Sequence, residues 1–326
     1  MSKIRDTDYL TISARVRAME NRLVTRERME QILDAKSGED AGKLLQEWGY
    51  PQLDPRRREA MDATLSAVRE ATLADLAEGT PDARYIDLFK VKYDYHNVKA
   101  LLKAEAVGTA PDRMLMDMGR VSTAELAEAV RSRELDGLPE TLAAAVAEAR
   151  EVLDTTRDPQ LSDIVLDRWC YRDMAALAEE TGSAFLRGYV AVQVDAVNLR
   201  TAVRTLRMGK GADFLLGALL EGGDLAPDAV AKAASSGAAG LRELYGATRF
   251  RDAAEAGAEA LKGGPLTAFE KLCDDAVGDY LAGAQSVPFG EAPLVSYLAA
   301  RETEYTNLRI LLMGRAAGID PAVIRT

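Results

Sequence analysis

Asp94-Tyr95-His96-Asn97-Val98-Lys99 is the first of three copies of one short pattern in this 326-residue chain. The other two copies are Asp195-Ala196-Val197-Asn198-Leu199-Arg200 and Glu304-Tyr305-Thr306-Asn307-Leu308-Arg309. In each copy, which we call the repeat motif, an acidic residue is followed at the third place by Asn, then by an aliphatic residue and a base. The copies lie about 100 residues apart, a domain-sized period that is longer than that of solenoid repeats. The sequence therefore predicts a triplication.

Rare residues at matched places argue against the alternative, a chance match of one degenerate amphipathic pattern. The chain contains only four asparagines, and three of them, all except Asn21, occupy the same place in the repeat motif. A glycine also follows each motif Asn at the same distance, as Gly108, Gly209 and Gly318. Glycine readily takes the left-handed conformation that ends a helix, so we expect each motif helix to stop there.

On a helix, the aliphatic positions of the repeat motif form one apolar face, and the acid and Asn lie one turn apart on a neighbouring face. The acid and the base are five places apart and cannot pair with each other, so we expect them to contact different neighbours. A buried polar group without a partner costs about 1–3 kcal/mol, which means that the acid and Asn need partners at a helix crossing. We therefore interpret them as a hydrogen-bonding clamp with an architectural role.

The pattern of the whole chain predicts helices, because no stretch alternates at period two for more than a few residues. Matched helix starts precede the motifs, at Val24-Thr25, Val121-Ser122 and Leu225-Ala226-Pro227, and Thr80-Pro81-Asp82 is expected to cap a further helix with Pro81 at its first position. Breaks near Gly108 and Gly222 suggest three domains, at residues 1–112, 113–217 and 218–326. The predicted fold class is all-α.

Composition limits the classes of function. The formal net charge of −11 argues against nucleic-acid binding, which needs a concentrated basic surface. There is no apolar run long enough to span a bilayer, and the N-terminal segment lacks the apolar core of a signal peptide. With only two cysteines to suggest a reducing compartment, we expect a cytoplasmic protein.

The sequence offers few candidates for catalysis. His96 is the only histidine, and the other copies of the repeat motif have Val197 and Thr306 at its place, so we interpret it as a packing or surface residue. No phosphate-binding loop, nucleophile elbow or metal-binding His or Cys motif occurs. We expect no catalytic residue, no cofactor and no metal. The candidate site residues are structural and are those of the repeat motif: Asp94, Asn97, Lys99, Asp195, Asn198, Arg200, Glu304, Asn307 and Arg309.

Together with residues 9–20, the segments that carry the three motifs, 92–103, 185–204 and 304–311, resemble the C subunit of the V-type and archaeal-type rotary ATPases, whose eukaryotic counterpart is the d subunit of the vacuolar ATPase. Between the motifs the similarity is confined to the helical pattern. Lys99 replaces the Arg of the other copies, so the internal symmetry is incomplete.

This resemblance implies three similar helical domains arranged with pseudo-threefold symmetry as a funnel around a central cavity. It implies a non-catalytic adaptor of the central rotor that links the central stalk, made of D-type and F-type subunits, to the proteolipid ring in the membrane. Such an adaptor transmits torque for proton or sodium transport coupled to ATP hydrolysis or synthesis, and it is peripheral to the membrane through the ring. Two alternatives stay open at this point: a helical scaffold unrelated to an ATPase, and a helical enzyme that uses carboxylates with perturbed pKa values in a cleft.

Overall fold

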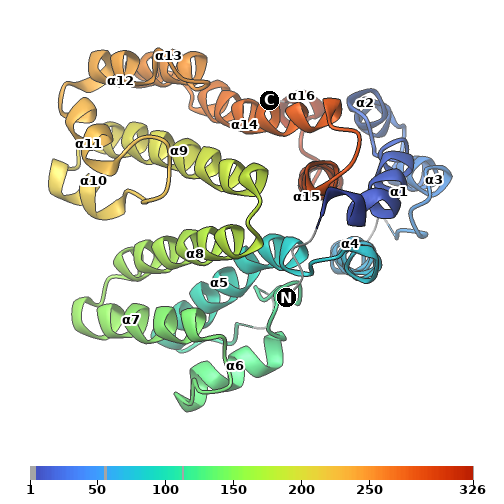
Figure 1. Cartoon of the computed structure of the whole chain (residues 1–326), viewed down its shortest axis with the longest axis horizontal. Helices are drawn as coiled ribbons and strands as arrows, with labels where there is room; N and C mark the ends of the chain where they lie inside the picture. The colour runs from blue at the N-terminus through green and yellow to red at the C-terminus, as the bar shows by residue number, and fades with distance from the viewer. Residues whose placement is uncertain (1–4, 55–56, 112–113, 326) are drawn as a thin grey trace. The chain divides into compact units, whose positions relative to one another are not determined.

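Helices account for the regular secondary structure of this chain wherever it is described. The computed structural model describes residues 5–54, 57–111 and 114–325, and no strand occurs within these ranges (Figure 1). The all-α prediction is therefore confirmed. The helices are η1 (Asp6–Tyr9), α1 (Leu10–Glu20), α2 (Arg26–Asp34), α3 (Gly38–Glu47), α4 (Arg58–Gly79), α5 (Arg84–Val107), α6 (Thr123–Ser132), α7 (Glu140–Thr156), α8 (Pro159–Thr181), α9 (Ala184–Arg207), α10 (Ala212–Ala218), α11 (Pro227–Ser235), α12 (Gly237–Tyr245), α13 (Arg251–Ala260), α14 (Thr267–Ala282), η2 (Gly283–Ser286), α15 (Glu291–Ala316) and α16 (Pro321–Ile324).

The three matched helix starts are confirmed. The hydroxyl of Thr25 accepts a hydrogen bond from the main chain at the start of α2, and Ser122 forms a reciprocal capping box with Glu125 at the start of α6. Pro227 is the first residue of α11. The expected cap before α5 is wrong in detail, because the Asp82 carboxylate accepts the Arg84 N–H (3.0 Å) and the helix begins after Pro81 rather than at it.

The three motif helices, α5, α9 and α15, end in the same way. Gly108, Gly209 and Gly318 have φ values of 70°, 67° and 71°, which is the left-handed conformation that we expected of them. The residue after each glycine donates its N–H to a carbonyl oxygen five places earlier, at 2.9, 3.1 and 3.0 Å. This pattern is the Schellman motif, and it satisfies carbonyl groups that the helix end would leave without partners.

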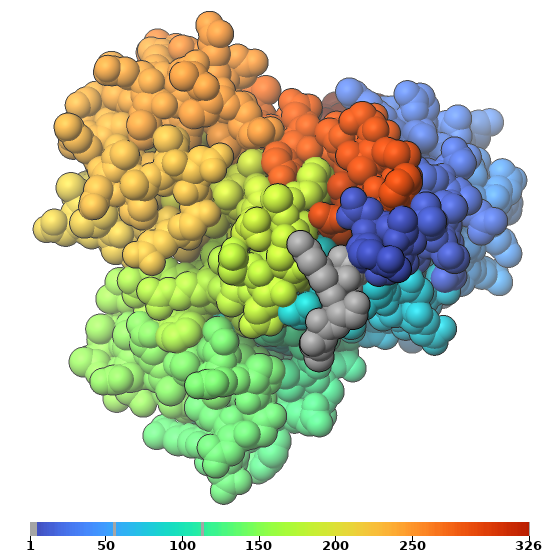
Figure 2. All heavy atoms as spheres, in the orientation of Figure 1, coloured from blue at the N-terminus to red at the C-terminus, as the bar shows by residue number. Residues whose placement is uncertain are grey.

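The first compact unit combines the two ends of the chain, residues Met1–Ile86 and Leu281–Thr326. Its core joins apolar side chains of α2, α3 and α4, such as Ile32, Leu45 and Leu65, to Leu308 and Leu312 of α15. In Figure 2 the N-terminal residues, in dark blue, lie directly beside C-terminal residues, in red. The helix that carries the third motif is therefore packed against the first helices of the chain.

The second compact unit comprises residues Asp87–Tyr280 and carries the first two motifs. In Figure 1, α7 and α8 run side by side, and α8 is followed by α9. A core of fully buried side chains joins α9 to α11–α14, through Leu199, Val203, Leu241, Phe269 and Cys273. The division into three domains at 1–112, 113–217 and 218–326 stays a prediction, and its first boundary lies outside the described residues.

Among the described residues, no helix is both long enough and apolar enough to cross a lipid bilayer.

Candidate functional site

The first copy of the repeat motif holds the main chain that leads into α6. Asp94 is fully buried, and its Oδ1 accepts the N–H groups of Arg120 (2.9 Å) and Val121 (3.2 Å). One turn further along α5, Asn97 pairs with both main-chain groups of Met116: its Nδ2 donates to the carbonyl oxygen and its Oδ1 accepts the N–H, each at 2.8 Å. Two side chains of one helix thus fix the connection to the next helix.

The second copy repeats this arrangement on α9. Asp195 accepts the N–H groups of Asp224 (3.1 Å) and Leu225 (3.2 Å), and Asn198 pairs with both main-chain groups of Leu220 at 2.8 Å. Both motif side chains are buried. The partners occupy matching places in the two copies. Leu220 lies five places before Leu225, as Met116 lies five places before Val121, and each acid accepts the N–H of the first residue of the matched helix start and of the residue before it.

The third copy is completed by the N-terminal part of the chain. Glu304 Oε1 accepts the N–H of Val24 (3.2 Å) and the hydroxyl of Tyr50 (2.6 Å), while its Oε2 accepts a bond from Arg301 (2.7 Å). Val24 is the matched counterpart of the residues held by the acids of the first two copies. Asn307, by contrast, is exposed and forms no hydrogen bond with a residue in the described part of the chain.

Each base of the motif forms an ion pair with a carboxylate on another helix of its own unit. Because the acid and the base lie on different sides of the helix, they reach different neighbours. The pairs are Lys99 with Asp167 of α8 (2.5 Å), Arg200 with Asp274 of α14 (2.5 Å), and Arg309 with Asp62 of α4 (2.6 Å).

Two glycines that the sequence analysis did not single out make the clamps possible. A Cβ at Gly119 would clash with Asp94 Oδ1, and a Cβ at Gly223 would clash with Asp195 Oδ1. Gly119 lies two places before Val121, and Gly223 lies two places before Leu225, the first residues of the matched helix starts. This shared spacing is the signal that could have revealed the two glycines. In the third copy Arg22 stands at that place, and the acid is Glu, which is one methylene longer than Asp.

The buried acids differ in their charge partners. Arg120 donates from Nε to Asp94 (2.8 Å) and from both Nη atoms to Asp173 (3.1 and 2.6 Å). Burial raises the pKa of Asp94 above its ordinary value, and the Arg120 guanidinium opposes that rise. No ion pair is found for Asp195 among the described residues, and burial raises its pKa to about 6 although the N–H groups of Leu225 and Asp224 favour the charged form.

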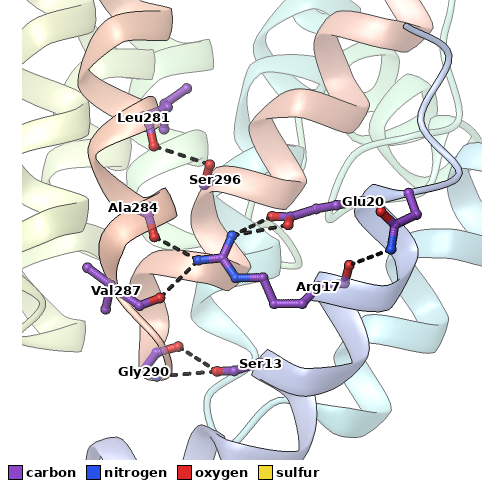
Figure 3. A network of polar contacts seen from close by, with 9 residues as sticks. Ser13, Arg17, Glu20, Leu281, Ala284, Val287, Gly290 and Ser296 are labelled. Carbon is purple, nitrogen blue, oxygen red and sulfur yellow. Dashed lines mark hydrogen bonds and ion pairs between the residues drawn. The ribbon is translucent and has the colours of Figure 1, made fainter.

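A polar network ties α1 to the segment that precedes α15 (Figure 3). The guanidinium of Arg17 donates to the carbonyl oxygens of Ala284 (2.8 Å) and Val287 (2.9 Å). Ser13 and Gly290 exchange two hydrogen bonds of 3.2 Å, one donated by the Ser13 hydroxyl and one by the Gly290 N–H. These contacts keep α1 beside the segment that leads into α15, whose Glu304 bonds to Val24, between α1 and α2, and to Tyr50, after α3.

The second unit contains a cavity of about 200 Å³ between α5, α8 and α9. Lys99 and Asp167, which line it, are already paired with each other, and burial raises the pKa of the Cys170 thiol to about 12, which suppresses the reactive thiolate. His96, also at the cavity, has Nε2 3.0 Å from the Met114 carbonyl oxygen. No cluster of potential metal ligands occurs in residues 5–54, 57–111 and 114–325.

Comparison with known proteins gives one consistent result. The family described as ATP synthase (C/AC39) subunit matches residues 12–326. The chain is similar to the C subunit of the V-type sodium ATPase of Enterococcus hirae, with 25% identity and 94% of each chain covered. It is also similar to the C subunit of the V-type ATP synthase of Thermus thermophilus (27% identity, 97% of each chain covered). A third relative is the C subunit of the A-type ATP synthase of Methanocaldococcus jannaschii (23% identity, covering 98% of this chain and 85% of the relative).

Proposed function

Because this chain belongs to the ATP synthase (C/AC39) subunit family, and is thus a non-catalytic subunit of a rotary ATPase, we propose that it is the adaptor of the central rotor. In this role it links the central stalk, made of D-type and F-type subunits, to the proteolipid ring in the membrane. It transmits torque between ATP hydrolysis or synthesis in the soluble head and proton or sodium transport in the membrane. It lies on the cytoplasmic side, peripheral to the membrane through the ring.

The observation that carries this proposal is the repeated fixation of three long helices. An adaptor under torque must resist relative motion of its helices, and interfaces that hold under load need complementary charge and close packing. Each motif helix is tied by its acid to the main chain before a matched helix start, and by its base to an ion pair on another helix. We propose that the three repeats form the pseudo-threefold funnel that the sequence resemblance implies.

The contacts of the motifs support a grouping of the repeats that is shifted along the chain. The first two motifs hold main chain that follows them, whereas the third holds the N-terminal segment through Val24. We therefore propose that one repeat consists of α15 with α1–α4, and that the other two follow one another within residues Asp87–Tyr280. Three repeats are retained, but the ends of the chain lie inside one of them.

The carboxylate-dependent enzyme that the sequence left open gains no support from the buried acids. Such an enzyme needs a perturbed carboxylate in a cleft that a substrate can enter. Asp195, whose pKa is raised to about 6, is 3% exposed and accepts two main-chain N–H groups. Its raised pKa therefore has a structural cause.

The test is co-purification of the tagged full-length chain from its own cells, with detergent-solubilised membranes included and the partners identified by mass spectrometry. The proposal predicts that central-stalk and proteolipid-ring subunits are recovered together in reproducible ratios. A parallel purification from untagged cells controls for adhesion to the resin. Recovery of a monodisperse lone protein, while the intact ATPase is purified without it, would overturn the adaptor role.

A further inference from the structure

The helix α15 exposes its motif Asn, which is buried in the other two motif helices. Thr303, Thr306, Asn307 and Ile310 recur at helical spacing, and we call them the α15 stripe. All four are exposed, and Ile310 is 57% exposed. At the places of Asn307, the first two copies have Asn97 and Asn198, each fully buried.

The internal copies show what such a face binds. In both of them the Asn carboxamide pairs with the N–H and the carbonyl oxygen of one residue, and that residue is a large aliphatic one, Met116 or Leu220. In both copies the bound residue is not part of a helix. The arrangement is thus recognition of an extended segment with an aliphatic side chain.

Neither neighbouring segment of the described chain fills this place on α15. The residue in the register of Met116 and Leu220 is Met19, which lies inside α1, and its carbonyl oxygen accepts the Arg22 N–H (2.9 Å). On the other side, Ile324 of α16 lies against Gly314, two turns beyond Asn307. Within residues 5–54, 57–111 and 114–325, neither the donor nor the acceptor of the Asn307 carboxamide therefore has a partner.

We propose that the α15 stripe binds an extended segment of another subunit of the rotary ATPase. The main chain of that segment pairs with Asn307, and a Leu or Met of the segment packs on Ile310. This inference rests on the proposed function, because it takes the partner from the same complex. The inference adds to the proposed function one surface of this chain, the α15 stripe, that contacts a partner subunit.

The association is measured by binding the purified full-length chain to solubilised membranes from cells that lack it. Asn307→Ala removes two hydrogen bonds and is expected to weaken the association about tenfold, with an unchanged melting temperature of the free chain because Asn307 is exposed. Gln46→Ala, which removes an exposed carboxamide on α3 of the same unit, is the matched control and should leave the association unchanged.

Cross-linking identifies the occupant. Cys170 and Cys273 are buried, so Ile310→Cys adds one accessible thiol for a photoreactive label, and Leu216→Cys (Leu216 is 45% exposed) serves as the control position. A cross-link from position 310 to a segment of an ATPase subunit that contains Leu or Met, absent from position 216, supports the proposal. A cross-link to a second copy of this chain, to its own ends, or to no ATPase subunit overturns it, as does unaltered binding of the Asn307→Ala variant.

Binding of the wild-type chain to the membranes distinguishes a failure of the stripe assignment from a failure of the proposed function. If it associates with the membranes while position 310 captures no ATPase subunit, the stripe assignment fails and the adaptor role stands. If the wild-type chain does not associate at all, the proposed function itself fails, and the stripe assignment with it.

Discussion

The carboxamides of Asn97 and Asn198 show how one side chain can hold a connection between helices. Each satisfies both polar groups of one main-chain residue, and the pairing of Asn198 with Leu220 is buried. The sequence predicted that the motif Asn needs a partner but not that the partner is main chain. Main-chain groups carry no residue identity, so nothing at Met116 or Leu220 marks them as partners.

Replacing Asn198 tests this use of the carboxamide. Asn198→Leu keeps the size of the side chain but leaves the N–H and carbonyl oxygen of Leu220 buried without partners. We expect the free energy of unfolding to fall by about 3 kcal/mol, with a lower melting temperature and impaired assembly, while ATP hydrolysis by the isolated head is unchanged.

The third copy supplies the control for that substitution. Asn307→Leu makes the same chemical change at an exposed place and should leave the melting temperature nearly unchanged. Equal melting temperatures of the Asn198→Leu variant and the wild-type chain would refute the clamp.

The buried carboxyl group of Asp195 gives the stability of the chain a defined pH dependence. Its pKa is about 6 in the folded protein and near its ordinary value of 3.8 in the unfolded chain. Because the folded pKa is the higher one, the folded state binds more protons between about pH 4 and pH 6. The contribution of this group to stability is therefore greatest below pH 4, falls as the pH rises to 6, and stays constant above.

Asp195→Asn removes this titration. Between pH 4 and pH 7, the difference in unfolding free energy between variant and wild type should shift in favour of the variant by about 2 kcal/mol. Urea unfolding of the variant and the wild type at several pH values measures this difference. A flat profile for Asp195→Asn would contradict the assignment of a raised pKa.

Helix ends are where the sequence was most informative. The caps at Thr25 and Ser122 and the terminal glycines follow from local chemistry within a few residues, and the structure confirms them. The start of α5 was misplaced because Asp82 bonds to the Arg84 N–H and the helix begins at Arg84, whereas Pro81 was expected to be its first residue. Gly119 and Gly223 were missed because the atoms that they accommodate belong to the side chains of Asp94 and Asp195, more than twenty residues earlier in the sequence.

The loop before α11 should tolerate no side chain at position 223. Gly223→Ala places a methyl group on the carboxylate of Asp195, so either the carboxylate or the loop must move, and we expect a loss of about 2 kcal/mol in unfolding free energy. Gly278→Ala is the control, since a Cβ there meets no atom within 4 Å inside α14 and should stabilise the chain by up to about 1 kcal/mol. Chemical denaturation compares the two variants, and equal stabilities would argue against the close approach.

For the molecule as a whole, the threefold occurrence of the repeat motif and the helical class follow from the sequence, but the way in which the ends of the chain meet does not. Glu304 bonds to Val24, and Arg17 bonds to Ala284, across almost the full length of the chain. Pairings at such separations leave no periodic signal, because they depend on the packing of every helix between them. The sequence therefore indicated three linear domains, whereas the contacts of the motifs support repeats that are shifted so that the first and last segments belong together.

The most direct test of the adaptor role measures coupling. ATP-driven ion transport is followed in inverted membrane vesicles from cells that lack the chain, with both proton and sodium fluxes recorded, before and after the purified chain is added back. The account predicts that ATP hydrolysis by the soluble head persists without the chain, that ATP-driven transport is lost, and that adding the chain restores it. Transport that continues at the wild-type rate in vesicles without the chain would contradict the account.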